Sequence, residues 1–339
     1  MIGSDGQNEI FLSIIIPVWN REREILSSVR SVARQIKDRA AEIILVDDGS
    51  TDGTPHSVCL LSAECNKVRT VRLKSNVGAA AARNAGLERA CGRYVWFVDS
   101  DDFVPDGSVD RIWSELVNSM PDVLRFDKIN GAAWKDVKRS LAEEPCQPVS
   151  LDLECKAEDL LFCLSNGSVW NAVFSQGAIG AVRFDENFTY GEDAPFTWAV
   201  VLRSRCGKYL PMPMYVYNQT ACSMTSAKSP LRFNCYMRQV DEFIRLIERS
   251  DLCDQIKRKL VSECVWRVYS HAFGCYRPSE IDNDMWEVWR DVYRRVLTGN
   301  RRRTKVQRFL SWVSLGIQTR YIAYLVFRFL LQYRRRHRR

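Results

Sequence analysis

The chain has 339 residues, of which 46% are hydrophobic and 27% charged, values typical of a folded globular protein and not of a disordered chain. This length accommodates one large domain or two smaller ones. The formal net charge is +8, but residues 301–339 hold twelve Lys or Arg and no Asp or Glu, leaving 37 basic against 41 acidic side chains in the first 300 residues. The body is therefore mildly acidic, and the end of the chain is strongly basic.

Cysteine and histidine give no metal-binding pattern. The twelve cysteines include no CxxC pair, and the three histidines, His56, His271 and His337, lack metal-ligand spacing. Residues 1–10 lack the basic and apolar regions of a secretory signal. We therefore expect a cytoplasmic protein with reduced cysteines and no structural disulfides.

Four short runs rich in Val and Ile alternate with segments of helical period over the first hundred residues. The runs span residues 12–16, 43–46, 68–73 and 94–98. Between the first two, apolar residues recur every three or four positions, giving one apolar helical face. This alternation is typical of parallel β-α-β units. We predict an α/β fold with a Rossmann-like, mostly parallel sheet flanked by helices.

Polar residues follow each predicted strand, at 17–20 (PVWN), 47–50 (DDGS), 75–78 (SNVG) and 99–102 (DSDD). In open parallel sheets, ligands bind in the crevice beyond the carboxyl ends of the strands. We therefore expect these four segments to face one site.

The Asp99-Ser100-Asp101 triplet directly follows a predicted strand, so two carboxylates emerge together at the sheet edge. Such a pair needs a cation, and hard oxygen ligands suit Mg²⁺ or Mn²⁺, which commonly completes its shell with substrate phosphates. The alternative is a polar turn that caps the next helix.

Asn76 and Gly78 precede an alanine-rich predicted helix that carries Arg83 and Gly86. A helix start offers N–H groups to phosphate, and an arginine can bind the same anion through two of its N–H groups. The pattern indicates a phosphate site, and it is also compatible with alanines that pack tightly on the sheet.

Two further acidic pairs are candidates. Asp47 and Asp48 end a predicted strand, where a carboxylate suits hydrogen bonds from a base or ribose, or simply forms an Asp-Gly turn. Glu192 and Asp193 follow an aromatic stretch. In a partly apolar pocket, neighbouring like charges raise one pKa toward the working pH, which suits a general base, whereas most such pairs are solvated surface.

Beyond residue 110 the pattern is weaker. Residues 131–150 lose clear period, and residues 151–225 mix short helical and extended signals. From about residue 230 the pattern is helical. We expect boundaries near residues 110 and 228, with residues 229–339 forming a helical C-terminal extension.

Residues 306–333 are apolar, but three arginines interrupt them, so no uncharged run reaches the roughly 18 residues of a membrane span. Arg320, Tyr324, Arg328 and Gln332 form a narrow polar stripe beside a broad apolar side, which predicts a helix lying on an anionic membrane surface. The alternatives are RNA binding and packing of the helix on the body or on a partner. We expect peripheral association with the inner face of the cell membrane and no nucleic-acid partner.

Together, these motifs resemble the family 2 glycosyltransferases with the GT-A fold. The likeness runs in order through LSIIIPVWNREREIL, EIILVDDGSTDGT, NVGAAAARNAGLERACGRYVWFVDSDD, VWNAVF and RFDENFTYGEDAPF, and ends with Tyr215-Val216-Tyr217 followed by Ser223-Met224-Thr225. It covers about residues 11–226. It implies a nucleotide-sugar-binding half in residues 1–110 and an acceptor-binding half in residues 111–228.

The resemblance also implies roles for individual residues. The predicted nucleotide-binding residues, including those of the phosphate site, are Pro17, Trp19, Glu22, Asp47, Asp48, Asn76, Gly78, Arg83, Asp99 and Ser100. Asp99 and Asp101 match the DxD pair, with Asp101 as the main contact to Mn²⁺ or Mg²⁺. Asp193, supported by Glu192, matches the base that deprotonates the acceptor hydroxyl. Trp170 and Asn171 correspond to acceptor contacts.

Two positions depart from the family pattern: Ala172 stands where many members carry Lys, and Trp19 replaces the usual Tyr. The absence of a QxxRW motif disfavours a processive synthase. The implied function is inverting, metal-dependent transfer of a single sugar from a nucleotide-sugar, such as a UDP-sugar, to a lipid-linked or saccharide acceptor in polysaccharide biosynthesis. The alternative is a non-catalytic nucleotide-sugar-binding or scaffolding protein on the same fold.

Overall fold

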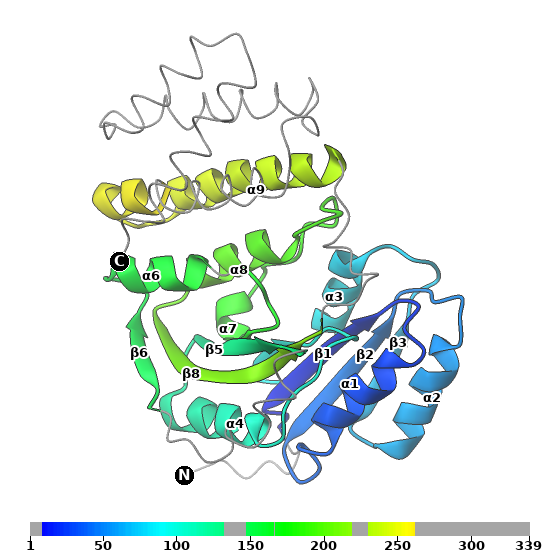
Figure 1. Ribbon diagram of the computed structural model, residues 1–339. Helices are drawn as coiled ribbons and strands as arrows, with labels where there is room; N and C mark the ends of the chain where they lie inside the picture. The colour runs from blue at the N-terminus through cyan, green and yellow to red at the C-terminus, as the bar shows by residue number, and fades with distance from the viewer. Residues whose placement is uncertain (1–8, 132–146, 166, 219–229, 262–339) are drawn as a thin grey trace. The chain divides into compact units, whose positions relative to one another are not determined.

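The computed structural model describes residues 9–131, 147–165, 167–218 and 230–261 (Figure 1). These residues divide into two compact units. Residues 9–188 and 192–218 belong to the first unit, and residues 189–191 and 230–261 belong to the second. Every residue of the predicted site lies in the first unit.

The first unit is built on an eight-stranded sheet with the order β3-β2-β1-β4-β7-β5-β8-β6. The strands are β1 (Leu12–Val18), β2 (Ala41–Asp47), β3 (Val68–Arg72), β4 (Tyr94–Phe97), β5 (Val123–Asn130), β6 (Val149–Asp152), β7 (Ala172–Ser175) and β8 (Cys206–Tyr217). Neighbours from β3 to β4 are parallel, as are β5 and β8, whereas β7 runs antiparallel to β4 and β5, and β6 to β8. The predicted α/β fold with a mostly parallel sheet is confirmed.

Helices cover both faces of this sheet (Figure 1). The helices of the first unit are α1 (Glu24–Ala33), α2 (Thr54–Glu64), α3 (Ala79–Leu87), α4 (Ser108–Ser119), α6 (Ala157–Leu164), α7 (Gln176–Ile179) and α8 (Asp193–Val201). On one face, α1, α2 and α4 share a single apolar core with β1 and β2. On the other face, α3 packs against β1, and α8 reaches β4 through a contact between Phe196 and Phe97.

β1 and β2 are almost entirely buried because helices shield both sides of them, which explains their near-continuous apolar sequences. The polar side chains inside them are paired. Ser13 donates to the buried Glu42 at 2.7 Å, and Glu42 also accepts from the Cys91 N–H at 2.9 Å and from Arg69 at 2.7 Å. Because β1 and β2 begin here, this network lies at the end of the sheet opposite to the predicted site.

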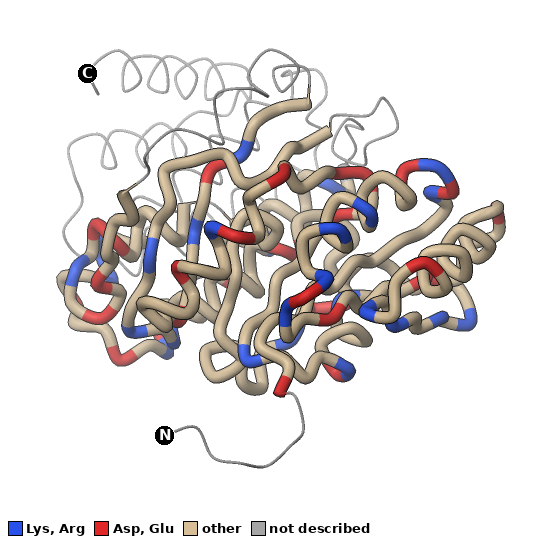
Figure 2. Tube along the Cα trace, turned by 90° about the horizontal axis from the view of Figure 1, so that it is seen from below, with Lys and Arg blue, Asp and Glu red and all other residues tan. Residues whose placement is uncertain are grey.

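The second unit contains α9 (Pro230–Arg249). Among the residues that the structure describes, no helix is long and apolar enough to cross a membrane. Lys and Arg are interspersed with Asp and Glu along the described trace (Figure 2). The predicted interfacial helix at 306–333 lies outside the described residues, so it stays a prediction.

Gly49 brings two strand-end loops into close contact. Its φ is +65°, and a Cβ at this position would lie 2.4 Å from the carbonyl carbon of Ser75. A side chain here meets both an unfavourable backbone conformation and fixed backbone atoms. Gly107, by contrast, has a φ of +82° with nothing within 4 Å of an added Cβ.

We therefore expect Gly49→Ala to destabilise the protein more than Gly107→Ala. The φ strain alone predicts a cost of about 1–2 kcal/mol at either position, and the displaced loop adds roughly 1–3 kcal/mol at Gly49. Urea unfolding of both variants measures the difference. Equal losses of unfolding free energy would show that the two loops are not held in contact.

Candidate active site

The loops after β1 and β2 are tied to each other by backbone-to-side-chain hydrogen bonds. The Asn20 N–H donates to the Ser50 hydroxyl at 3.0 Å, and the Thr51 N–H donates to the Asn20 side chain at 2.9 Å. Asn20 has a φ of +49°, a conformation that Asn tolerates better than most residues. The two strand ends thus form one fixed surface, and Asn20, which sequence reasoning did not single out, joins them.

Asp47 and Asp48 are buried at the end of β2. The two carboxylate oxygens of Asp48 accept the N–H groups of Val77 and Gly78 at 2.9 and 2.8 Å. Burial raises the pKa of Asp48, and these two N–H groups partly offset the rise. Asp47 Oδ2 has no hydrogen bond within the described structure and lies 3.5 Å from Nε of Arg72. Asp48 therefore holds the loop before α3, and nucleoside contacts of both residues stay predictions.

The predicted phosphate loop ends at Gly78, which precedes α3 and has a φ of +99°. Its N–H is shared between Asp48 and the Asn76 side chain, at 3.1 Å from Asn76 Oδ1. Further along α3, a Cβ on Gly86 would lie 2.4 Å from the Ile15 side chain. Gly86 thus lets α3 approach β1 closely.

Three predicted nucleoside-binding residues lie along the same strand ends. Pro17 is the half-buried penultimate residue of β1. Trp19 is 49% exposed and presents a large ring to solvent, as a stacking surface requires. Glu22 is exposed, and its carboxylate occupies the space beside Gly53 that a larger residue would fill.

Asp99, Ser100 and Asp101 follow β4 at the same edge of the sheet. The Asp99 and Asp101 side chains are 26% and 23% exposed, and Asp101 lies 3.8 Å from Arg21. Burial and the charge of Asp99 raise the pKa of Asp101, while Arg21 lowers it. Negative charge is therefore in excess here, and these oxygen ligands fit a hard divalent cation.

No group of three or more His, Cys, Asp or Glu side chains in the described ranges is arranged to hold a metal ion. A divalent ion at Asp99 and Asp101 would need further oxygen ligands from elsewhere. Substrate phosphates commonly supply them.

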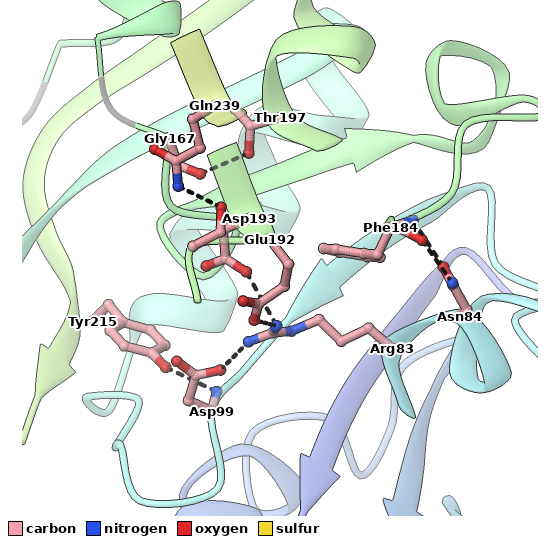
Figure 3. Close-up of polar contacts among 11 residues, drawn as sticks. Arg83, Asn84, Asp99, Gly167, Phe184, Glu192, Asp193, Thr197, Tyr215 and Gln239 are labelled. Carbon is pink, nitrogen blue, oxygen red and sulfur yellow. Dashed lines mark hydrogen bonds and ion pairs between the residues drawn. The ribbon is translucent and has the colours of Figure 1, made fainter. Parts of the chain in front are cut away.

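The buried guanidinium of Arg83, on α3, lies among three carboxylates (Figure 3). It donates to Glu192 at 2.6 Å and to Asp99 at 2.9 Å, and its Nη1 lies 3.1 Å from Asp193. Burial lowers the pKa of Arg83, but the three acids outweigh it and raise that pKa. The structure therefore brings the predicted metal ligand Asp99 and the predicted base Asp193 onto one cation.

Asp193 is the first residue of α8, and its side chain is 20% exposed. Burial raises its pKa to about 7; Arg83 lowers this pKa, while Glu192 and Asp99 raise it. One guanidinium cannot neutralise three carboxylates, so Asp193 retains affinity for a proton near neutral pH. This property suits a general base.

Asp102 and Tyr215 also lie at the site, although the sequence analysis assigned neither of them a role. The Tyr215 hydroxyl accepts the Asp99 N–H at 3.0 Å, and Asp102 accepts the Asn218 N–H at 2.8 Å. Burial raises the pKa of Asp102 to about 8, with Asp99 adding to the rise. These contacts tie β8 to the acidic loop. The run of acids at 99–102 and the motif Tyr215-Val216-Tyr217 contained these two residues, but neither pattern showed the contact between them and the site.

Trp170 and Asn171, the predicted acceptor residues, differ in their surroundings. The Trp170 ring stacks on Tyr215 and Tyr217, with centroids 4.9 and 5.6 Å apart, and the Lys128 ammonium lies 5.0 Å from its centroid. The Asn171 side chain is buried and accepts from Arg125 at 3.0 Å. Asn171 is thus engaged within the fold, and its acceptor contact stays a prediction, as does that of Trp170.

The family model for glycosyl transferase family 2 matches residues 13–166, from β1 to beyond α6. This range contains both strand-end acidic pairs and Arg83. The chain carries a family 2 glycosyltransferase domain.

Curated relatives share this domain. Glycosyltransferase GlyG of Streptococcus pneumoniae is 32% identical over 113 residues, and glycosyltransferase GlyA of the same organism is 27% identical over 212 residues. These matches cover 33% and 61% of this chain, but the chain spans only 37% of GlyG and 30% of GlyA. Residues 1–349 of S. aureus TarS, in a crystal structure with UDP-GlcNAc, are 21% identical with a TM-score of 0.68, covering 85% of this chain and 81% of that one. The last likeness shows the GT-A fold of the domain.

Removal of the Arg83 charge should destabilise the glycosyltransferase domain in a pH-dependent way. We expect Arg83→Met to lower the free energy of unfolding by about 3–5 kcal/mol, because three carboxylates then face one another without a cation. Arg83 lowers the pKa of Asp193, so without the cation this pKa rises further above its unfolded value, the folded state binds more protons and the loss grows with rising pH.

Urea unfolding at pH 5.5 and pH 8 tests this, with Arg30→Met as the control. Arg30 forms an exposed ion pair with Glu64 at 2.7 Å, and solvent screens such a pair, so its loss should leave the free energy of unfolding almost unchanged at both pH values. A loss in Arg83→Met that is no greater at pH 8 than at pH 5.5 would contradict the proposed charge balance.

Proposed function

We propose that the protein is an inverting, metal-dependent glycosyltransferase that moves a single sugar from a nucleotide-sugar donor to a lipid-linked or saccharide acceptor in polysaccharide biosynthesis. The observation that carries this proposal is the arrangement of Asp99 and Asp193 on either side of Arg83. This proximity supports a site in which Asp99 would bind the metal and Asp193 would act as the base. The UDP-GlcNAc complex of TarS supports a UDP-sugar as the donor.

On the donor side, Trp19 would stack on the base, and Asp47, Glu22 and Pro17 would line the nucleoside pocket. Asn76, Gly78, Ser100 and Arg83 would lie along the diphosphate. Asp99 and Asp101 would hold Mn²⁺ or Mg²⁺. When bound, the ion stabilises the negative charge that develops on the diphosphate leaving group.

On the acceptor side, Asp193 takes the proton from the acceptor hydroxyl, and Glu192 keeps the local charge negative. The hydroxyl oxygen then attacks the anomeric carbon as the bond from that carbon to the diphosphate oxygen breaks. The electron pair of the broken bond leaves with the nucleoside diphosphate. A single displacement of this kind inverts the anomeric configuration.

The basic segment at 301–339 would hold the enzyme on the inner membrane surface, where a lipid-linked acceptor is found. Its twelve Lys or Arg support this part of the proposal. Each basic residue near an anionic leaflet contributes about 1 kcal/mol.

Asp101→Asn should abolish metal-dependent nucleotide binding without unfolding the protein, because an amide is a weaker ligand than a carboxylate. Calorimetry with UDP, GDP and CDP, first with Mn²⁺ and then with EDTA, measures the effect and identifies the nucleotide. Binding of the variant at wild-type affinity with Mn²⁺ would refute the metal assignment. No binding by the wild-type protein under any condition would favour a non-catalytic scaffold.

Asp193→Asn should preserve donor binding and reduce transfer by about 100-fold or more, because an amide cannot accept the acceptor proton. Release of the nucleoside diphosphate from UDP-GlcNAc, UDP-glucose and UDP-galactose measures turnover, and calorimetry measures binding. Asp127→Asn is a suitable control, because Asp127 is exposed on β5 and contacts Tyr209. Wild-type turnover in Asp193→Asn would exclude Asp193 as the base.

A further inference from the structure

Asn84, the neighbour of Arg83 on α3, is buried and makes three hydrogen bonds to a distant part of the chain. Its Oδ1 accepts the Phe184 N–H at 2.9 Å, and its Nδ2 donates to the Phe184 carbonyl at 3.0 Å and to Glu186 at 2.9 Å. The side chain thus pairs with both backbone groups of Phe184, as a neighbouring strand would. Figure 3 shows this pairing beside the Arg83 cluster.

The hydrogen bonds from Asn84 fix Phe184, and the Phe184 ring in turn contacts α8. It stacks on Phe196 with centroids 4.0 Å apart and an interplanar angle of 3°, and it meets Phe97 of β4 edge-on at 5.2 Å. The Arg83 guanidinium lies 5.6 Å from the same ring. Phe196 is three residues after Asp193, so the two side chains lie on neighbouring positions of one helix face. A shift of Phe184 would therefore move the first turn of α8.

Further hydrogen bonds hold α8 in place, and at its acidic end the Phe184 anchor acts together with Arg83. Trp198 donates to the Leu164 carbonyl at 2.8 Å, and Thr197 donates to the Gly167 carbonyl at 3.0 Å. These bonds locate the middle of the helix. At its first turn, Arg83 donates to Glu192 at 2.6 Å and lies 3.1 Å from Asp193, which also has a hydrogen bond with the backbone of Val169. The stack of Phe184 on Phe196 supports the same turn from its aromatic side.

We propose that Asn84 is a positioning residue for the base: its bonds to Phe184 place the acidic start of α8, and Asp193 with it, against the donor-binding edge of the sheet. This inference rests on the proposed function, because it assigns Asn84 a role in turnover and none in donor binding. Asn84 reaches Asp193 through Phe184 and Phe196, so it is not itself a catalytic residue.

Asn84→Ala tests the inference. We expect kcat to fall about 10- to 100-fold, as a displacement of the base by about 1 Å would produce, while the KM for the donor and the affinity for UDP with Mn²⁺ change less than twofold. Hydrogen exchange at the Phe184 amide should become faster. The matched control is Asn118→Ala on α4, an exposed residue 3.3 Å from Ser114, which should leave all four quantities unchanged.

A rescue variant separates positioning from general destabilisation. Asn84→Asp keeps an acceptor for the Phe184 N–H but places a carboxylate against Glu186, so kcat should fall. Adding Glu186→Gln returns an N–H donor to the pair and should restore part of kcat. A thermal unfolding curve for each variant shows whether the measured protein is folded.

The inference is overturned by wild-type kcat in Asn84→Ala, or by loss of UDP affinity in parallel with kcat, or by failure of Glu186→Gln to restore any kcat lost in a folded Asn84→Asp variant. If any of these results is found while the wild-type protein transfers sugar, the inference about Asn84 is wrong but the proposed function stands. The proposed function itself is contradicted if the wild-type protein binds no nucleotide and releases none from any donor.

Discussion

One buried cation, the Arg83 guanidinium, holds together the acidic end of β4 and the acidic start of α8. Asp99 and Asp193 are nearly a hundred positions apart in the chain, and two carboxylates brought this close would repel each other without it. Glu192 adds a third negative charge on the same guanidinium. The cluster therefore carries excess negative charge, which favours a divalent cation on the Asp99 side and a proton on the Asp193 side.

The sheet order makes this cluster possible. β1 lies between β2 and β4, so the loops after these three strands meet at one edge. α3 returns from the edge strand β3 to β4 across the sheet face opposite to α1 and α2, and it carries Arg83 and Asn84 to that edge. Asp48 fixes the start of α3 through the N–H groups of Val77 and Gly78. The loop after β2 thus fixes the start of α3, and α3 in turn fixes the acids through Arg83.

The strand-end part of this arrangement could be predicted from the sequence, because parallel β-α-β units have a strong pattern and their carboxyl ends share one edge. The contacts of Arg83 with Glu192 and Asp193 could not be predicted. The sequence between Gly131 and Asp193 has no clear period, so it does not show that the chain comes back to α3 at these two acids. The contacts of Tyr215 and Asn84 could not be predicted for the same reason, because each joins residues more than 90 positions apart. The short strand β7, which carries Ala172, has only four residues and leaves no periodic signal.

The protonation of Asp193 is the most direct test of this charge balance. Titration of ¹³C-carboxyl-labelled Asp residues by NMR, with the Asp193→Asn spectrum assigning the signal, measures it without any substrate. The structure predicts a midpoint near pH 7, because burial and two neighbouring acids outweigh the single guanidinium. A midpoint near 4, the ordinary range for an aspartate, would show that Arg83 fully neutralises Asp193 and would contradict the account of the site as a base poised near neutral pH.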